Sequence, residues 1–336
     1  MHEVRWGMIG CGAVTEVKSG PAFARAERSR LLAVASATPA RARDWAARHG
    51  VDRAYDTAAE LLAAPDIDAV YIATPPASHK ALTLAAAAAG KHVYVEKPMA
   101  LNHADCAEMI AACAAARRGL FVAYYRRAMP RFLAVRDWLR EGAIGPVRAV
   151  GIVQHQPPAA EELSPATLPW RVRPEIAGGG KFLDMGAHAL DLLDWWFGPI
   201  AEVAGMAANR AGLYAAEDTV SACWQHESGV VGHGSWCYAA AETVDRLEIV
   251  GEAGEIAFEV FSDAPLRLRA RGREESLAIP NPEHVQQPFI QSVVDQLTEH
   301  GRCPGDAASA ARTTRVADAI LARWRGVAQL SSSLSQ

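Results

Sequence analysis

Short apolar runs alternate with helical stretches throughout residues 1–123, and this alternation limits the possible folds more than any other feature. Pro39, Pro76 and Asn102 stand where three helices are expected to begin, and Gly90 and Gly119 stand where two are expected to end. Strands joined by helices pair in parallel and are covered on both faces. We therefore predict an α/β domain over residues 1–123. Its candidate strands are residues 5–9, 31–35, 69–73, 92–95 and 120–123.

A different pattern begins at Tyr124. The apolar runs become longer, alternate with polar residues and are separated by turns that contain glycine. This alternation is typical of antiparallel sheets with one face against a core. Residues 124–330 are therefore predicted to form an α+β domain around a large, mostly antiparallel open sheet. The helices expected near 288–300 and 307–326 can pack on either domain, and residues 331–336 are expected to form a polar tail. The other candidate elements are helices near 131–141 and 181–196 and strands at 147–154, 219–226, 230–238 and 246–250.

Charge and cysteine content exclude several classes of protein. The 336 residues have a formal net charge of -4 and no long basic block, so neither nucleic acid nor a membrane surface is an expected partner. The six cysteines include no Cys-x-x-Cys pair, which argues against a disulfide framework or a metal site. No apolar run is long enough to span a bilayer, and the start of the chain lacks a secretory leader pattern. We therefore expect a cytoplasmic location.

The first expected strand leads into a glycine loop formed by Gly10, Cys11 and Gly12, and Ala13 and Val14 then open a helix. The first glycine permits a tight turn, and the second lets the backbone approach a pyrophosphate. Amide groups at the start of the helix attract the phosphates. Thr15 replaces the third glycine of the usual pattern. Because the loop joins a strand to a helix in a βαβ unit, it predicts a Rossmann domain that binds a dinucleotide.

The end of the second expected strand bears on the choice between NAD and NADP. NAD-binding domains usually carry an acidic residue there for the ribose hydroxyl, and residues 35–41 contain none. Ser36, Thr38 and Arg41 are instead suited to a 2′-phosphate. The pattern favours NADP, with NAD as the alternative. Arg41 is also compatible with the solvated face of a helix.

Lys97 follows a candidate strand, residues 92–95, and precedes Pro98. A residue before proline is excluded from helical geometry, so Lys97 is expected to be extended at the carboxyl end of this strand. Open α/β sheets bind their ligands at this edge. A short Glu-Lys-Pro segment by itself favours a surface lysine, and the rest of the chain gives it a functional meaning.

A second candidate group follows three consecutive glycines, residues 178–180. Asp184, His188 and Asp191 are spaced to share one face of an apolar helix. A carboxylate one turn from a histidine can fix its tautomer and raise its pKa, which suits proton transfer. One alternative is a metal site, although no third strong ligand is close in sequence. The other is a histidine that is hydrogen-bonded within the core.

Taken together, these motifs resemble the glucose-fructose oxidoreductase, inositol dehydrogenase and related sugar dehydrogenase family over nearly the whole chain. The resemblance implies that Thr74, Pro75 and His79 flank the cofactor and that Glu96 contacts the nicotinamide side. It makes Lys97 the catalytic lysine, with Asp184 and His188 as the acid and the histidine on the substrate side. The motifs are Gly10-Cys11-Gly12, residues 73–79, residues 89–98 and residues 178–188.

Residues 169–180, which include Trp170 and Arg171, also resemble the substrate loop of the NADP-dependent 1,5-anhydrofructose reductase branch. In that branch Ser36 and Arg41 would hold the 2′-phosphate. Arg126, Trp170 and Arg171 are expected to shape the substrate pocket. The run Tyr124-Tyr125-Arg126-Arg127 departs from the branch, which leaves the substrate open.

The expected function is reversible hydride transfer between nicotinamide and a hydroxyl or carbonyl carbon of a sugar, polyol or related ring. Lys97 would act as the general acid or base, with His188 oriented by Asp184. One alternative is an enzyme like trans-dihydrodiol dehydrogenase that acts on an aromatic diol. Another is a sensor that binds NADP without catalysis. By analogy with the family, a homo-oligomer, either a dimer or a tetramer, is expected.

Overall fold

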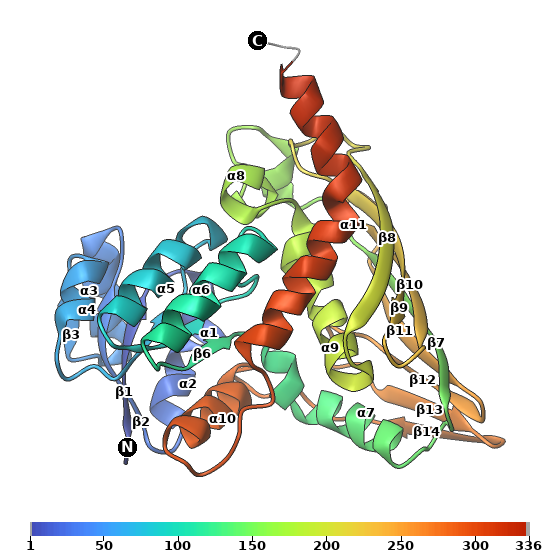
Figure 1. Ribbon diagram of the computed structural model, residues 1–336, viewed down its shortest axis with the longest axis horizontal. Coiled ribbons are helices and arrows are strands. Elements are labelled where there is room, and N and C mark those ends of the chain that lie inside the picture. Colours follow the sequence, from blue (N-terminus) through green and yellow to red (C-terminus); the bar gives the residue numbers. More distant parts are fainter. Residues whose placement is uncertain (1, 334–336) are drawn as a thin grey trace. The chain divides into compact units, whose positions relative to one another are not determined.

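The computed structural model describes residues 2–333, which form two compact units (Figure 1). The first contains the chain up to Met129 together with Asn281–Ala311, and the second contains Pro130–Pro280 and the chain from Arg312 onward. The first unit therefore continues beyond the boundary expected at residue 123 and includes a segment distant in sequence.

The first unit is built on a parallel sheet of six strands in the order β3-β2-β1-β4-β5-β6. Its two central strands, β1 and β4, are almost entirely buried, because helices cover both faces. All five predicted strands are present, whereas β3 was missed because it is only three residues long and half-buried. The strands are β1 (Val4–Ile9), β2 (Ser29–Ala35), β3 (Arg53–Tyr55), β4 (Ala69–Ile72), β5 (His92–Val95) and β6 (Leu120–Val122).

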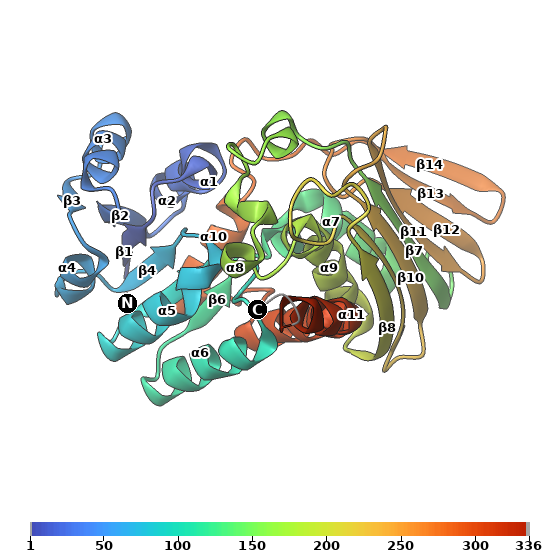
Figure 2. The same cartoon turned by 90° about the horizontal axis from the view of Figure 1, so that it is seen from above.

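Seven α-helices of the described chain belong to the first unit, and capping residues explain several of their starts. Thr57 forms a capping box with Glu60, and the side chain of Asn102 accepts a hydrogen bond from the Asp105 amide. Helices α5 and α6 lie side by side (Figure 2). The helices are α1 (Ala13–Val17), α2 (Gly20–Arg25), α3 (Pro39–His49), α4 (Ala58–Ala63), α5 (His79–Ala88), α6 (His103–Ala115) and α10 (Gln287–Leu297).

The second unit contains a sheet of eight strands in the order β14-β13-β12-β11-β7-β10-β9-β8. Only β7 and β10 pair in parallel, so the predicted large and mostly antiparallel sheet is confirmed. Buried and exposed residues alternate along most of its strands. The strands are β7 (Val147–His155), β8 (Ile200–Ala208), β9 (Thr219–His226), β10 (Val231–Cys237), β11 (Val244–Gly251), β12 (Gly254–Phe258), β13 (Leu266–Ala270) and β14 (Arg273–Leu277).

Helices cover one face of this sheet (Figures 1 and 2). Phe132 of α7 (Pro130–Arg140) and Trp196 of α9 (Ala187–Phe197) both contact the ring of Phe258 on β12. Ile320 of α11 (Ala307–Ser333) lies against Gly205 of β8, where a Cβ would be 2.7 Å from it. No helix of the described residues lies over the opposite face in either view. The unit also contains the short helix α8 (Pro174–Ala177).

Two sequence-based predictions about helices need correction. Residues Phe182–Gly186 form a π-helical turn, so Asp184 does not keep α-helical register with His188. Gly186 permits close packing here, because an added Cβ would lie 2.7 Å from the Phe182 ring. Helix α11 runs to Ser333, so the tail expected from residue 331 is wrong for 331–333, and the rest of it, 334–336, lies outside the described residues.

Candidate active site

The glycine loop after β1 has the backbone geometry that phosphate binding needs. Gly10 has a φ of +106°, and an added Cβ would lie 2.6 Å from the carbonyl oxygen of Ala73. At Gly12, by contrast, nothing lies within 4 Å of an added Cβ. Gly10 thus serves the turn itself, whereas Gly12 leaves open space beside the start of α1, where a pyrophosphate fits.

Two neighbouring residues have structural roles in this loop. Thr15, in place of the third glycine, is fully buried, and its Oγ1 donates to the Gly12 carbonyl at 2.7 Å. Burial raises the pKa of the Cys11 thiol to about 11. Cys11 is therefore a protonated core residue at neutral pH, and only its backbone is available to a cofactor. Ala13 and Val14 are not buried and form the first turn of α1.

Arg41 differs from the other arginines of α3. Arg43 pairs with Asp56, and Arg48 pairs with Glu16 at 2.8 Å and with Asp44 at 2.9 Å. Arg41 is exposed, and within the described part of the chain it has no ion-pair partner. Ser36 lies between β2 and α3, and its Oγ accepts a hydrogen bond from the Thr38 amide at 3.2 Å. The end of β2 therefore presents two hydroxyls and an uncompensated cation.

His79 holds together the segments that follow β4 and β5. Its Nε2 lies 2.7 Å from the carbonyl oxygen of Thr74, and its Nδ1 lies 3.0 Å from that of Pro98. The ring is fully buried, and burial lowers the pKa of His79. Any effect of this ring on a cofactor must therefore act through the two loops. Thr74 and Pro75 are not fully buried and lie on one of those loops.

A buried hydrogen-bond network surrounds Glu96. Its Oε1 accepts hydrogen bonds from the Tyr71 hydroxyl and the Gln286 amide, both at 2.6 Å. Gln286 in turn accepts a hydrogen bond from Tyr94 at 2.8 Å. Burial, together with the Glu96 charge, raises the pKa of Tyr71 well above its usual value, so this hydroxyl remains a donor. Sequence reasoning missed Tyr71 and Gln286, because nothing in either segment indicates a distant carboxylate.

Lys97 lies at the edge of this network. It is half-buried two residues beyond β5, and its backbone amide donates to Glu96 Oε2 at 3.3 Å. The Lys97–Pro98 peptide bond is cis. Lys97 and the glycine loop both follow the carboxyl ends of parallel strands, so they lie at the same edge of the six-stranded sheet.

In the second unit, three of the predicted substrate-side residues come together. Arg171 Nε lies 3.1 Å from Asp184 Oδ2, and the Arg171 guanidinium stacks on the Trp170 ring at 4.5 Å. His188 is buried in α9 beside the Phe261 ring, with the ring centroids 5.8 Å apart. Arg126 belongs to the first unit, where it is buried over the Tyr125 ring. The structure therefore groups Trp170, Arg171 and Asp184 within the second unit.

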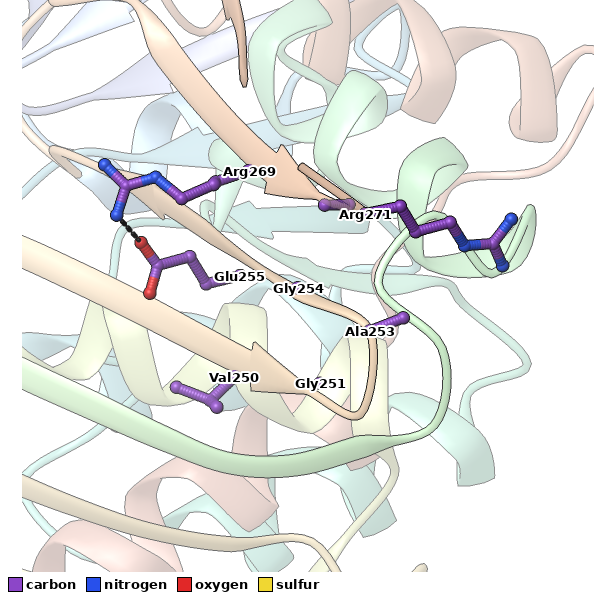
Figure 3. A pocket seen from close by; sticks show the side chains of 8 residues that line it. Val250, Gly251, Ala253, Gly254, Glu255, Arg269 and Arg271 are labelled. Carbon is purple, nitrogen blue, oxygen red and sulfur yellow. Dashed lines mark hydrogen bonds and ion pairs between the residues drawn. The ribbon is translucent and has the colours of Figure 1, made fainter. Parts of the chain in front are cut away.

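The second unit also contains an open surface hollow beside the turn from β11 to β12 (Figure 3). Arg269 pairs with Glu255 at 3.0 Å at its edge, while Arg271 points away from that pair. None of the predicted site residues lines this hollow, which lies on a hairpin, and it contributes nothing to the candidate site.

Two features that would indicate metal binding or membrane insertion are absent from the described residues. No three His, Cys, Asp or Glu side chains converge as metal ligands there. Among the same residues, no helix combines the length and the apolar character required to cross a bilayer.

Comparison with known proteins decides the family. Residues 4–124 match the oxidoreductase family with an NAD-binding Rossmann fold, and residues 132–257 match the Gfo/Idh/MocA C-terminal domain. The chain belongs to the Gfo/Idh/MocA oxidoreductase family. It is 37% identical to oxidoreductase P35 of Formosa agariphila over 94% of this chain and 97% of that protein.

Other members of the Gfo/Idh/MocA family are similar over most of their length. The chain is 30% identical to 1,5-anhydro-D-fructose reductase of Ensifer adhaerens, covering 89% of each protein. It is also 30% identical to trans-1,2-dihydrobenzene-1,2-diol dehydrogenase of Bos taurus, over 82% of this chain and 80% of that one. A similar solved structure is the aldose-aldose oxidoreductase of Caulobacter crescentus in complex with glycerol, with a TM-score of 0.84, 27% identity and coverage of 96% and 98%.

Proposed function

We propose that this family member is an NAD(P)-dependent oxidoreductase acting on a carbon that bears a hydroxyl or carbonyl group in a sugar, polyol or related ring. The observation that carries the proposal is the position of Lys97 at the sheet edge that also bears the open glycine loop. Ligands of parallel sheets bind at this edge. The names of the relatives, which include an anhydrosugar reductase and an aldose oxidoreductase, support the substrate class.

In this proposal the chain moves a proton while the cofactor carries the hydride. A bound nicotinamide supplies or accepts the hydride at the reacting carbon. In oxidation, Lys97 would act as the general base that takes the hydroxyl proton. In reduction, its ammonium group returns a proton to the carbonyl oxygen. Asp184 and His188 are the proposed substrate-side residues, and His188 would bind the reacting oxygen or relay its proton.

Residues around the site divide between positioning and recognition. Glu96 is held at Oε1 by Tyr71 and Gln286, so its Oε2 is placed to hold the backbone amide of Lys97. Trp170, Arg171 and Arg126 are proposed to shape the substrate pocket. A stacked arginine and tryptophan present an apolar face and N–H donors, which suits a ring that carries hydroxyls.

We further propose that NADP is preferred over NAD. The unpaired guanidinium of Arg41 and the hydroxyls of Ser36 and Thr38 favour a 2′-phosphate, and no carboxylate follows β2 to bind the ribose hydroxyl. Ionised donors form stronger hydrogen bonds to phosphate than neutral ones do. A cytoplasmic location remains a prediction from the sequence.

A second candidate function is oxidation of an aromatic trans-diol, which the similarity to the bovine diol dehydrogenase favours. The Trp170 ring would then be expected to contact an apolar substrate ring rather than a sugar face. A panel of aldoses, anhydrosugars and trans-diols, each tested with NADPH or NADP⁺, separates the two candidates by kcat/KM.

The decisive variant is Lys97→Ala. General acid–base catalysis typically contributes roughly 10² to 10⁴ in rate, so turnover is expected to fall by at least about a hundredfold. NADPH affinity, measured by fluorescence titration, is expected to stay within about threefold, because the glycine loop is unchanged. Equal kcat in Lys97→Ala and the parent chain refutes the assignment. Binding of NADPH without turnover of any compound supports a non-catalytic sensor instead.

A further inference from the structure

A buried ion pair joins the loop after β7 to the segment that carries Asp184. Lys181 Nζ lies 2.6 Å from Glu162 Oε1, and the two side chains are only 10% and 2% exposed. Lys181 stands between Gly180 and the π-helical turn, and Glu162 lies in the short helix Ala160–Leu163. The same cation lies 5.9 Å from the centre of the buried Tyr238 ring. Glu162 Oε2 also accepts a hydrogen bond from the Ala159 amide at 3.2 Å.

This pair is the buried side-chain attachment of residues 157–167, the outer part of the loop. Among residues 156–171, all of which the structure describes, Glu162 is the only one that is buried. Between residues 157 and 167 the other hydrogen bonds are local to the loop, such as those from Thr167 to Glu161 and Ser164. The exposed Leu163 gives this stretch no apolar anchor, whereas Leu168 and Val172 further along the loop pack with Tyr214 and Ala216. The position of this stretch therefore depends on the Glu162–Lys181 pair.

A second ion pair fixes the other end of the loop to the same short segment. Arg171 pairs with Asp184, three residues beyond Lys181 in sequence. The two attachments differ in exposure, because the Arg171 side chain is 43% exposed whereas the inner pair is buried. Exposed ion pairs contribute little to stability and change partners easily, whereas a buried ion pair is favourable only in one well-defined geometry. The inner pair is thus suited to fix the loop, and the outer pair remains free to respond to a ligand.

We propose that Glu162 and Lys181 are positioning residues that hold residues 157–167, the part of the loop that leads to Trp170 and Arg171 beside Asp184. Neither residue touches the reacting atoms. Their contribution is to substrate affinity, because the loop is ordered before the substrate arrives. The statement about substrate rests on the proposed function, whereas the statement about the loop does not.

The first test follows the loop without any substrate. Lys181→Met and Glu162→Gln are compared with the parent chain by hydrogen–deuterium exchange of peptides from residues 157–167. Exchange there is expected to quicken about tenfold or more in both variants, while peptides from β5 stay unchanged. Arg269→Met is the matched control, because Arg269 forms an exposed pair with Glu255 in the same unit. Unchanged exchange in Lys181→Met overturns the proposal.

The second test separates positioning from simple stabilisation. Lys181→Met is expected to raise KM for the substrate about tenfold, with kcat and NADPH affinity within about twofold. The double variant Glu162→Leu with Lys181→Met buries no charge, so its melting temperature is expected to recover. Its KM and loop exchange are expected to remain raised, because an apolar pair has no directional bond. If KM recovers together with the melting temperature, the pair is only structural.

The two proposals fail in different ways. If the parent chain oxidises or reduces nothing, the proposed function is wrong and the exchange measurement still decides whether the pair holds the loop. If catalysis is present and only the loop data disagree, the positioning role alone is wrong.

Discussion

At the scale of single residues, the same chemical group acquires different properties from its surroundings. Glu96 and Glu217 are both buried carboxylates. Glu96 is bonded to several donors, whereas Glu217 is bonded to the Gly180 amide at 2.8 Å beneath the triple-glycine loop. Burial raises the pKa of Glu217 to about 7, although that hydrogen bond and the Arg325 charge oppose the shift. Glu217 is a residue that the sequence pattern did not single out.

The raised pKa of Glu217 predicts a pH-dependent stability. The usual value is 4.5, so between pH 4.5 and about 7 the folded state keeps a proton that the unfolded state has lost, and stability falls as the pH rises. A difference of this size corresponds to roughly 3 kcal/mol above pH 7. Glu217→Gln is therefore expected to raise the melting temperature at pH 8 and change it little at pH 4.5. A difference in melting temperature between Glu217→Gln and the parent chain that stays constant across this pH range contradicts the prediction.

The two loop glycines predict separable defects. Gly10→Ala places a Cβ at a positive φ and 2.6 Å from the Ala73 carbonyl, so the unfolding free energy is expected to fall by roughly 2 to 4 kcal/mol. Gly12→Ala meets no protein atom within 4 Å, so its stability is expected to change little while NADPH affinity falls. Thermal melts of the apoprotein and NADPH titrations check both. Equal loss of stability in the two variants refutes this division of roles.

At the scale of elements, partners on neighbouring segments decide which side chains remain available. Helix α3 carries three arginines at its exposed face, and ion pairs occupy Arg43 and Arg48. Only the position nearest the end of β2, Arg41, remains to meet a phosphate. The helix therefore concentrates its free positive charge where the proposed cofactor would need it.

This arrangement predicts the outcome of changing Arg41. Arg41→Ala is expected to weaken NADPH binding roughly tenfold or more, since a hydrogen bond to a charged group contributes roughly 1.5 to 3 kcal/mol. NADH binding is expected to remain within about twofold, because it lacks the 2′-phosphate. Arg43→Ala is the control, since Arg43 is paired with Asp56. If fluorescence titrations show that Arg41→Ala weakens the binding of NADPH and of NADH equally, the preference for NADP is contradicted.

At the scale of the whole molecule, each unit has one feature that local sequence patterns do not predict. In the first, Gln286 joins the segment Asn281–Ala311 to β4 and β5 through Glu96 and Tyr94. In the second, helices cover only one face of the eight-stranded sheet in the described residues. The other face mixes apolar side chains, including the exposed Met206, Val231 and Cys223, with charged ones such as Glu255 and Arg269.

The uncovered sheet face supports the prediction of a homo-oligomer. A second copy of the chain would bury this surface, so light scattering after size exclusion is expected to give a dimer or tetramer. The double variant Met206→Glu with Val231→Glu adds like charges to the face and is expected to shift the mass to that of one chain. Arg43→Ala, which changes a charge on α3 of the first unit, should leave assembly intact. A parent chain that is monomeric at every concentration refutes the prediction.

Sequence by itself determined the parallel sheet, the glycine loop and the place of Lys97, because strand alternation, helix caps and glycine spacing are local patterns that act within one or two turns of chain. It also led to the prediction of Asp184 and His188 as substrate-side residues, although it misread the π-helical turn that contains Asp184 as regular helix. Only the tertiary structure decided that Gln286 binds Glu96 and that Lys181 binds Glu162. These pairs join residues 190 and 19 positions apart, and a buried charge leaves no periodic pattern that shows where its partner lies.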